Sequence, residues 1–562
     1  MSLPSWSDTR VNRQLDSGSS WSDPIITYAF PNVVGGIDTS GGEGTAFVPL
    51  NANQRAIATL SLALWDDLIV NGISRVVSGL SDVEFGMSRT GVDYAHAYYP
   101  NVGSVWFNLN NEELVSPIVG EYGFSTYIHE IGHALGLDHA GDYNGTGNWT
   151  PSYFQDSTVY TIMSYFGPDR ETGQNQVAWG DWTAVNGITY SAQTPMLNDV
   201  MAIQAMYGAD TTTRTGDTIY GFSSNISQNG LDAVYDFSLN AHPILCIYDA
   251  SGVDTLNLSG WHTTSNINLS GGTLSSCNSM TNNLSIARNT LIENLITGSG
   301  DDILQGNIAE NRLDGGLGLD TVLYAHSIHD YAFRRTGNDL VVEDSIINRD
   351  ALDNLLNIER LEFSDWQGSI QEKTASEQMA VLNLAGQLSE YWVSGNIEAA
   401  VIVDYHENRG GLQLISDYQR LEFTDFNIGL DSGAGEKAGM AYRLYKAAFD
   451  RVPDLGGVGY WIHRMDNGLS LQSTANEFIS SPEFAKLYGT NPSDSAFVTL
   501  LYEHVMHRAA DGEGFNFWVN ALAPNGGWTR PEVLAYFSES PENLDQTATL
   551  VANGIQYVEY VA

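Results

Sequence analysis

The feature that most constrains this chain is a histidine-rich run, His129-Glu130-Ile131-Gly132-His133-Ala134-Leu135-Gly136-Leu137-Asp138-His139. A helix through its first half presents His129 and His133, four residues apart, on one face. Gly136 permits a sharp turn after the helix, and this turn can return His139 to the same metal ion. Three neutral nitrogens leave one coordination position of a zinc ion for water, which is typical of a catalytic site.

Three other side chains can belong to such a site. Glu130 follows the first histidine directly, where it can accept a proton from the water. Met163 and Tyr165 lie downstream. Taken alone, they would be interpreted as a core residue and a half-buried aromatic residue, but the histidine motif favours a place for both in the metal site. The alternative for the whole pattern is a surface helix with unrelated histidines. The spacing of the three histidines favours the metal site, so we predict a catalytic zinc ion.

The same residues resemble a known family. The run HEIGHALGLDH matches the extended zinc motif of the metzincin metalloproteases, and IMSYF resembles the Met-turn of the serralysins among them. The resemblance covers residues from about 17 to 325, including the segments 194–199 and 213–222. It implies a zinc-dependent endopeptidase in which Met163 forms an apolar floor under the metal. It also implies that Tyr165 is an additional zinc ligand, which swings away to hydrogen-bond the oxyanion. Ala140 departs from the family, which usually has proline there.

Hydrophobic periodicity predicts the elements around the motif. We expect strands at 25–30, 83–87 and 104–108, and helices at about 53–69 and 125–135. Strands and helices in one segment indicate an α/β or α+β domain, and the resemblance to metzincins implies an α/β catalytic domain over residues 17–208. We also expect Trp106 and Phe107 to lie on an edge strand to which an extended substrate adds by backbone hydrogen bonds.

A nine-residue repeat follows in a segment rich in glycine and polar residues. TGSGDDILQ, GNIAENRLD and GGLGLDTVL lie end to end over residues 297–323. This pattern predicts a calcium-binding parallel β-roll over residues 209–325, in which one aliphatic residue per unit fills the core. The alternative is a series of ordinary β-hairpins. The candidate calcium ligands are Asp217, Gly252, Asp254, Gly298, Gly300, Asp302, Asn311, Gly316, Gly318 and Asp320.

The last 237 residues contain two further repeats. Residues 357–365 recur at 417–425 with alternating polarity, which indicates a β-rich extension over 326–435. Residues 451–461 recur at 508–518, which indicates a helical tandem repeat over 436–562. This last segment is similar to a domain of unknown function at the C-termini of bacterial secreted calcium-repeat proteins. We expect it to carry a secretion signal or to contact a cell surface or glycan.

Composition excludes several classes of protein. The chain has 24 Lys and Arg against 67 Asp and Glu, a net charge of −43, which disfavours binding to nucleic acid or anionic lipid. No run of about 18 apolar residues predicts a membrane span. The N-terminus lacks the pattern of a Sec-type signal, and residues 1–16 are the candidate for a short propeptide. Cys246 and Cys277 leave open one disulfide or two free thiols.

Together these patterns predict a multidomain α+β protein. It has a metzincin catalytic domain, a calcium-binding β-roll with a β-rich extension, and a mainly helical C-terminal domain. Its cofactors are Zn²⁺ and several Ca²⁺ ions. The resemblance implies a bacterial, extracellular enzyme that reaches its protein substrates by type I secretion, and extracellular calcium would favour folding after export. The second hypothesis is a surface-binding or adhesive protein with a vestigial or self-processing protease site.

Overall fold

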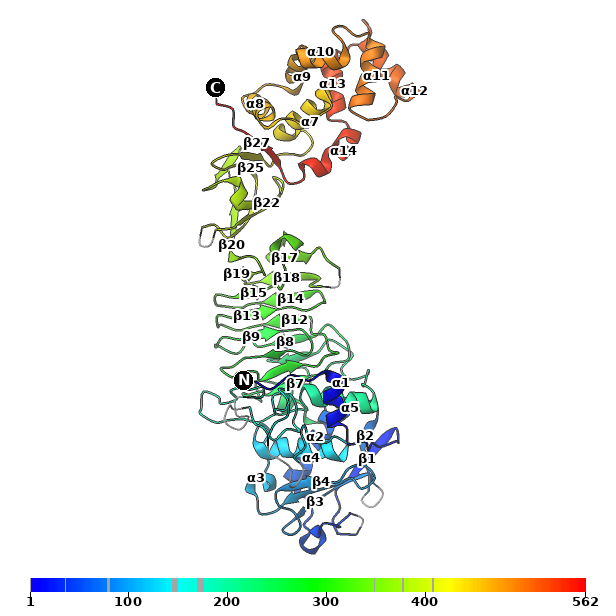
Figure 1. Ribbon diagram of the computed structural model, residues 1–562, viewed down its shortest axis with the longest axis vertical. Helices are drawn as coiled ribbons and strands as arrows, with labels where there is room; N and C mark the ends of the chain where they lie inside the picture. The colour runs from blue at the N-terminus through cyan, green and yellow to red at the C-terminus, as the bar shows by residue number, and fades with distance from the viewer. Residues whose placement is uncertain are drawn as a thin grey trace. The chain divides into compact units, whose positions relative to one another are not determined.

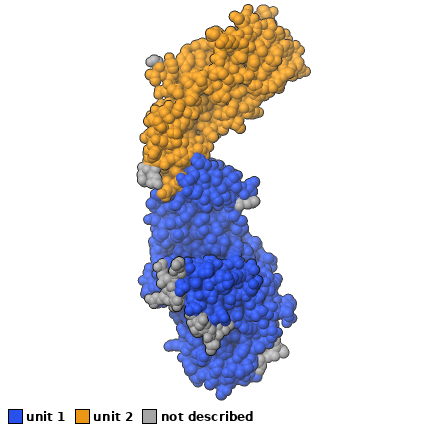
Figure 2. Space-filling view, viewed as in Figure 1, with its two compact units in different colours: residues 1–365 blue, residues 366–562 orange. Residues whose placement is uncertain are grey.

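The computed structural model describes residues 2–35, 37–77, 81–143, 150–168, 176–347, 349–376, 379–406 and 409–561. The chain divides into two compact units, residues 1–365 and 366–562 (Figure 2). The finer division predicted at residues 208, 325 and 435 stays a prediction. The sheets are mixed with helices in the first unit, and the C-terminal part of the second unit is helical, as expected (Figure 1).

The first unit begins with a five-stranded sheet. Its strand order is β2 (Gly72–Arg75), β1 (Ile25–Ala29), β3 (Val83–Ser88), β5 (Ser104–Asn108) and β4 (Ala95–Ala97). All neighbours pair in parallel except β4, which runs antiparallel to β5 and forms one edge of the sheet. The predictions of strands at 25–30, 83–87 and 104–108 are confirmed.

The prediction that Trp106 and Phe107 lie on an edge strand is wrong. Both side chains are fully buried, and β5 lies between β3 and β4. Every residue of β5 is buried, which is typical of an interior strand covered on both faces. Apolar character marked the strand correctly, but it carries no information about which strands flank it. The edge belongs to β4.

Two helices connect the sheet to the histidine motif. Helix α2 (Ala52–Asp66) begins at a capping box formed by Asn51 and Gln54. It packs against α4 (Tyr122–Ala134), and the indole N–H of Trp65 donates to the carbonyl of Ile128 at 3.1 Å. Both helices were predicted, although α4 begins three residues earlier than expected. Gly136 follows α4 with a φ of 107°. A Cβ atom there would lie 2.1 Å from the carbonyl oxygen of Ser19, so only glycine fits this turn.

The N-terminal segment packs onto the same region. Helix α1 (Asp8–Leu15) contacts α5 (Leu197–Tyr207) and buries Val11 and Leu15. Asp16 forms a β-bridge with Leu137, inside the histidine motif. Residues 8–16 are therefore an integral part of the fold that surrounds the site.

Two sheets with parallel strands follow (Figure 1). We call these parallel strands, which lie between residues 219 and 362, the parallel stack: β6, β8, β9, β12, β13, β14, β15, β18 and β19. The first sheet contains β6 (Ile219–Gly221), β8 (Thr255–Asn257), β12 (Asn294–Ile296), β14 (Asn311–Asp314) and β18 (Leu352–Leu356). The second contains β9 (Asn266–Asn268), β13 (Ile303–Gln305), β15 (Thr321–Leu323) and β19 (Arg360–Glu362).

The register of the stack reflects the nine-residue repeat. Leu304 pairs with Val322 in one sheet and Leu313 pairs with Leu295 in the other, so successive units alternate between the two sheets. Leu304, Leu313 and Val322 are fully buried, as predicted for the inward aliphatic position. The parallel pairing continues past residue 325 to β18 and β19, and the segment at 357–365 supplies the second of these strands. A hairpin of β16 (Tyr331–Thr336) and β17 (Asp339–Asp344) pairs with β18.

The remaining elements of the first unit are short. They are η1 (Glu43–Ala46), α3 (Glu112–Val115), η2 (Gln228–Gly230), α6 (Asp232–Tyr235), η3 (Ile328–Asp330) and the three-stranded sheet of β10 (Leu274–Ser275), β11 (Leu284–Ile286) and β7 (Leu245–Ile247). Cys246 and Cys277 are both buried free thiols, which settles the alternative left open by the sequence.

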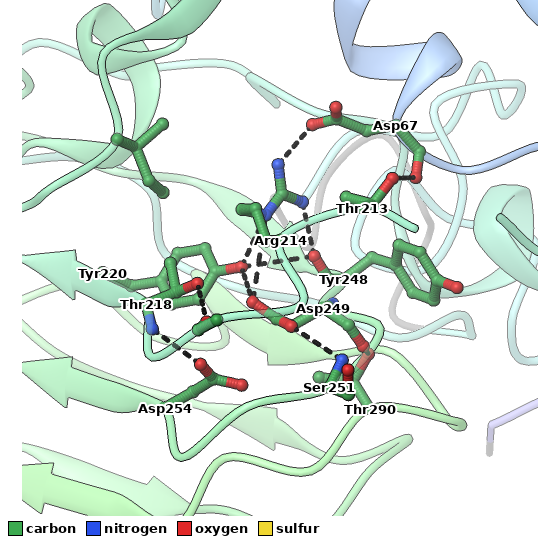
Figure 3. Close-up of polar contacts among 12 residues, drawn as sticks. Asp67, Thr213, Arg214, Thr218, Tyr220, Tyr248, Asp249, Ser251, Asp254 and Thr290 are labelled. Carbon is green, nitrogen blue, oxygen red and sulfur yellow. Dashed lines mark hydrogen bonds and ion pairs between the residues drawn. The ribbon is translucent and has the colours of Figure 1, made fainter. Parts of the chain in front are cut away.

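A buried arginine joins α2 to the first turns of the parallel stack (Figure 3). Arg214 forms an ion pair with Asp67 at the end of α2, and its Nε donates to the hydroxyl of Tyr220 at 2.8 Å. Tyr220 in turn donates to Asp249 at 2.8 Å. The network therefore connects the end of α2, at Asp67, to Tyr220 on β6 and to Asp249, before β8.

The second unit combines sheets and helices. Its strands are β20 (Gln367–Thr374), β21 (Ala380–Asn383), β22 (Tyr391–Gly395), β23 (Ala400–Asp404), β24 (Leu412–Ser416), β25 (Tyr418–Glu422), β26 (Asn427–Gly429) and β27 (Ile555–Tyr557), with η4 (Leu388–Glu390) between β21 and β22. Its helices are α7 (Lys437–Phe449), α8 (Leu455–Asp466), α9 (Leu471–Ile479), α10 (Pro482–Tyr488), α11 (Asp494–His504), α12 (Gly512–Leu522), α13 (Arg530–Ser538) and α14 (Pro541–Val551).

The helical tandem repeat has a structural counterpart. Asp454 caps α8 and Asp511 caps α12, each by accepting the N–H of the residue three positions later. Arg451 pairs with Glu483, and Arg508 pairs with Glu542 in the same way. Among the described residues, no helix is both long and apolar enough to cross a membrane.

Candidate active site

Three imidazoles converge at the end of α4. His129 and His133 lie one turn apart on the helix, and His139 returns from the turn that Gly136 permits. Their candidate ligand atoms all lie within 4.8 Å of one another, and no other group of three His, Cys, Asp or Glu residues in the described ranges comes so close. The predicted ligand set is therefore brought together in space.

The orientation of the rings is set by backbone carbonyls. Nδ1 of His129 donates to the carbonyl of Ile162 and Nδ1 of His133 donates to that of Leu137, both at 2.7 Å. Because a carbonyl only accepts, these bonds place the proton on Nδ1 and leave the lone pair of Nε2 facing the centre. Burial lowers the pKa of His129 to about 3 and that of His133 well below its ordinary value. Neutral imidazoles whose lone pairs face one point fit a zinc ion.

Glu130 borders the same space from α4. It is 6% exposed, and its Oε2 is buried with no hydrogen-bond partner among the described residues. Burial raises its pKa to about 8. The raised pKa means that this carboxyl group has a high proton affinity near neutral pH, and its unused oxygen beside the histidines is placed to take up a proton.

Tyr165 lies over the histidines and is 41% exposed. Its ring centroid is 4.5 Å from that of His139 and 5.9 Å from that of His129. Burial, with a smaller effect of Glu130, raises the pKa of Tyr165 to about 12, so the phenol keeps its proton at neutral pH. The ring of Tyr165 therefore lies beside two of the three imidazoles.

Met163 packs beneath α4, as expected for the floor of the site. It is fully buried, and a Cβ atom added to Gly132 would lie 2.9 Å from its sulfur. Asp199 fixes this segment, because its carboxylate accepts hydrogen bonds from the hydroxyl of Thr161 and the backbone N–H of Ile162. No role of Asp199 was predicted, although this residue lies in segment 194–199 of the family resemblance.

A second support was also missed. Asp138 accepts the backbone N–H of His139 at 2.7 Å and the hydroxyl of Tyr99 at 2.9 Å. Tyr99 follows the edge strand β4, so this pair joins the third histidine to the edge of the sheet.

A pocket of about 520 Å³ opens beside the histidines. Its walls are mainly aromatic and small side chains. The lining residues are Tyr94, Ala95, Tyr122, Ser125, Thr126, His129, Glu130, Thr158, Ile162, Ser164, Tyr165, Gly167, Pro168, Trp182, Thr189, Tyr190, Ser191 and Ala192. The pocket is large enough for a side chain of a peptide and is bordered by β4 through Ala95.

The predicted calcium ligands lie in the turns of the parallel stack. Asp254, Asp302 and Asp320 are each 1% exposed. One oxygen of each accepts a backbone N–H from a neighbouring turn, from Thr218, Ser265 and Asp302 respectively. The second oxygens of Asp302 and Asp320 are buried without a hydrogen-bond partner in the described part of the chain. Carboxylate oxygens of this kind fit a hard cation.

The predicted glycines bring backbone carbonyls to the same turns. A Cβ atom on Gly316 would lie 2.1 Å from the carbonyl oxygen of Gly298, and one on Gly318 would lie 2.1 Å from that of Gly300. Gly252 is similarly close to Gly216, with 2.7 Å between the added Cβ and the carbonyl oxygen. The bare backbones allow these turns to stack, which places carbonyl oxygens near the aspartates.

Other members of the predicted set differ. Asp217 is exposed and accepts the N–H of Val253. Asn311 is hydrogen-bonded to Asn307 in both directions, because its Oδ1 accepts the backbone N–H and its Nδ2 donates to the side-chain oxygen. Glu293 and Glu359 were not among the predicted calcium ligands. Their carboxylates accept the backbone N–H groups of Asp254 and Asp320, respectively.

Comparisons with known proteins agree with this geometry. Residues 98–192 match the family model Metallo-peptidase family M12B Reprolysin-like, and residues 209–403 match Peptidase M10 serralysin C terminal. Residues 475–547 match a domain of unknown function (DUF4214). Fold, site and matches together define a metalloprotease of the metzincin class.

Similar curated proteins are named serralysins. Serralysin A of Dickeya chrysanthemi is 41% identical over 273 residues, which are 46% of this chain and 54% of that protein. The metalloprotease AprA of Pseudomonas entomophila is 35% identical over 326 residues, 54% of this chain and 65% of its own length. The serralysin of Proteus mirabilis is 34% identical over 345 residues, 55% and 67% of the two chains. The chain belongs to the serralysin family, and it spans 54% to 67% of the length of these three relatives.

Proposed function

We propose that this chain is a secreted, zinc-dependent endopeptidase that cleaves extracellular proteins. The observation that carries the proposal is the convergence of His129, His133 and His139 beside the unpartnered carboxylate oxygen of Glu130, at the border of an open pocket. Membership of the serralysin family supports the same reaction class.

The roles of the side chains follow from their positions. A zinc ion held by the three imidazoles would polarise a water molecule and the carbonyl of the scissile peptide. Glu130 accepts a proton as the water oxygen bonds to the carbonyl carbon, and it delivers that proton to the amide nitrogen as the C–N bond breaks. Tyr165 lies beside the imidazoles, and its phenolic O–H donates a hydrogen bond to the developing oxyanion while keeping its proton. Met163 supplies apolar surface and takes no part in the chemistry.

Substrate alignment falls to the edge strand β4. In its antiparallel pairing with β5, the carbonyl of Tyr94 accepts from Asn108 and the N–H of Tyr98 donates to Ser104. Backbone groups alternate along such a strand, so those of Ala95 and Ala97 point away from β5. An extended substrate can add to this side by β-augmentation while one of its side chains enters the pocket.

The parallel stack is proposed to be a calcium-binding β-roll. The buried second oxygens of Asp302 and Asp320 and the stacked glycine carbonyls support this assignment. Calcium bound there would stabilise the folded state in a medium where the ion is plentiful. This is consistent with export of an unfolded chain through a type I secretion system, followed by folding outside the cell.

One observation favours the second hypothesis, that of a surface-binding protein. Phe517, Trp528 and Tyr536 in the helical part of the second unit are 58%, 39% and 52% exposed. Aromatic faces of this kind can stack on sugar rings. Glycan-array binding by the full chain, lost in a Trp528→Ala/Tyr536→Ala variant, would assign this function to the second unit, and absence of binding would remove it.

The proposed reaction is tested by incubating the calcium-loaded chain with casein and identifying the fragments by mass. We expect cleavage at internal peptide bonds that stops when a zinc-selective chelator is added in excess calcium. Release of single terminal residues only, or cleavage that persists without zinc, would contradict the proposal.

A further inference from the structure

A buried glutamate contacts the edge strand but belongs to neither the metal site nor the pocket. Glu43 begins the short turn η1 and is fully buried. Its Oε1 accepts the hydroxyl of Tyr98 at 2.9 Å and lies 2.9 Å from Nε2 of His96. His96 is the central residue of β4, and Tyr98 follows the strand directly. One carboxylate oxygen therefore contacts the side chain of a residue in the edge strand and that of the residue that directly follows it.

The contacts follow the alternation of the strand. Tyr94, His96 and Tyr98 direct their side chains to glutamates, since the hydroxyl of Tyr94 donates to Glu113 at 2.8 Å. These same residues direct their backbone groups to β5. Ala95 and Ala97 lie between them and present the backbone groups proposed to pair with substrate. Acidic side chains thus fix one set of residues while the other set is left for substrate.

The loop that carries Glu43 is itself fixed to the sheet. A Cβ atom on Gly41 would lie 2.3 Å from Oε1 of Glu43 and 2.8 Å from the hydroxyl oxygen of Tyr98. The hydroxyl of Ser88 on β3 donates to the carbonyl of Glu43 at 2.7 Å. The indole N–H of Trp106 on β5 donates to the carbonyl of Asp38 at 3.2 Å. The carboxylate is therefore held in a tight cradle by two interior strands.

This arrangement is costly for stability alone. Burying a carboxylate carries a large desolvation penalty, and Oε2 of Glu43 has no hydrogen-bond partner in the described ranges. Apolar side chains would fill such a space at lower cost. An edge strand, however, has a neighbour on only one side, and β4 has only three residues. Fixing it in advance lowers the ordering cost when an extended chain binds.

We propose that Glu43 is a positioning residue that fixes β4 for pairing with extended peptide substrates. The proposal rests on the endopeptidase function proposed above. Glu43 acts through His96 and Tyr98 and does not touch the reacting atoms. It therefore determines how well a long peptide binds, and the proton transfers at Glu130 proceed without it.

The test compares two substrates: a peptide long enough to pair with all of β4, and a capped dipeptide that cannot. Glu43→Gln keeps the size of the side chain but removes its charge, and Tyr98→Phe removes one donor without changing the ring. Glu84→Gln is the matched control, because Glu84 is a buried glutamate on β3, which does not neighbour β4. Zinc content and thermal unfolding are measured for each variant.

We expect Glu43→Gln to raise KM for the long peptide about tenfold, with kcat changed by less than about twofold. Tyr98→Phe should raise it about threefold. In both variants, KM for the dipeptide and the zinc content should stay at wild-type values. In the Glu84→Gln control, KM for both substrates should stay at wild-type values as well. Unchanged KM for the long peptide in both variants, or an equal loss on both substrates, would overturn the role of Glu43. Failure of the wild type to cleave either substrate would instead contradict the endopeptidase function.

Discussion

Asp199 and His129 form hydrogen bonds with the same residue, Ile162, one at its backbone N–H and the other at its carbonyl. The carboxylate of Asp199 accepts the backbone N–H of Ile162 at 2.7 Å, and the carbonyl of Ile162 accepts Nδ1–H of His129 at 2.7 Å. A side chain on α5 thus fixes the residue whose carbonyl orients a proposed metal ligand on α4. Because outer residues of this kind set ligand orientation, they affect metal affinity without touching the metal.

Asp199→Asn should weaken zinc binding. The carboxylate accepts three hydrogen bonds, from Thr161, Ile162 and Met196. In the asparagine variant one of the two oxygens is replaced by an NH₂ group, which is a donor and cannot accept these bonds. We expect zinc affinity to fall about tenfold to a hundredfold, measured by competition with a chelator. Asp545→Asn, an exposed position in the second unit, is the control. Wild-type zinc affinity in Asp199→Asn would show that the Met-turn needs no such support.

Tyr165→Phe should lower kcat while zinc remains bound. The ring and its contacts with the rings of His129 and His139 are preserved, but the proposed donor to the oxyanion is lost. Loss of one such donor reduces kcat by about a hundredfold to a thousandfold. Steady-state kinetics together with zinc content measure both effects. A variant with wild-type kcat would remove Tyr165 from the reaction.

Calcium binding should depend on the aspartates of the parallel stack. Asp302→Asn/Asp320→Asn should lose calcium and most of the calcium-dependent rise in Tm, because the buried second oxygens of these residues fit a cation. Asn311→Ala should lower Tm equally with and without calcium, because the partners of Asn311 are protein atoms. Calcium counts by native mass spectrometry distinguish the cases, and the opposite pattern would place the ion at Asn311.

Asp66 should make stability depend on pH. Burial, followed by the nearby charges of Asp67 and Asp210, raises the pKa of Asp66 to about 6 despite a hydrogen bond from Ile73. An unfolded aspartate titrates near pH ~3.9. Between pH ~4 and ~6 the folded state therefore binds more protons, and the free energy of unfolding falls as pH rises through this window.

Asp66→Asn removes that penalty while keeping an acceptor for Ile73. We expect it to stabilise the chain by about 1 to 2 kcal/mol at pH 7 and by little at pH 4, a value reduced for partial solvent screening. Asp67→Asn should instead destabilise the chain at pH 7, since it leaves the Arg214 guanidinium without its partner carboxylate. Urea unfolding at both pH values measures these changes, and equal effects of Asp66→Asn at pH 4 and 7 would contradict the assignment.

Local patterns predicted the chemistry of the site better than its surroundings. The three histidines and Glu130 lie within one helix and one turn, so their spacing alone places them together. The inward residues Leu304, Leu313 and Val322 follow from a fixed period in the same way. Both predictions depend on geometry that a short segment imposes on itself.

The residues that were missed depend on long-range contacts. Thr161 and Asp199 are 38 positions apart, Tyr99 and Asp138 are 39 apart, and Glu43 and His96 are 53 apart. No periodicity links such pairs. The wrong assignment of the edge strand has the same origin, because the order of strands in a sheet is set by tertiary packing. Apolar runs such as Ser104–Asn108 indicate burial but not neighbours.

The most direct test of the central claim is the cleavage rate of Glu130→Gln loaded with zinc, measured on casein beside the wild type at equal zinc content. Removal of the proton acceptor should lower the rate by about a hundredfold to ten-thousandfold while one zinc ion per chain is retained. A zinc-loaded Glu130→Gln chain that cleaves casein at the wild-type rate would contradict the account.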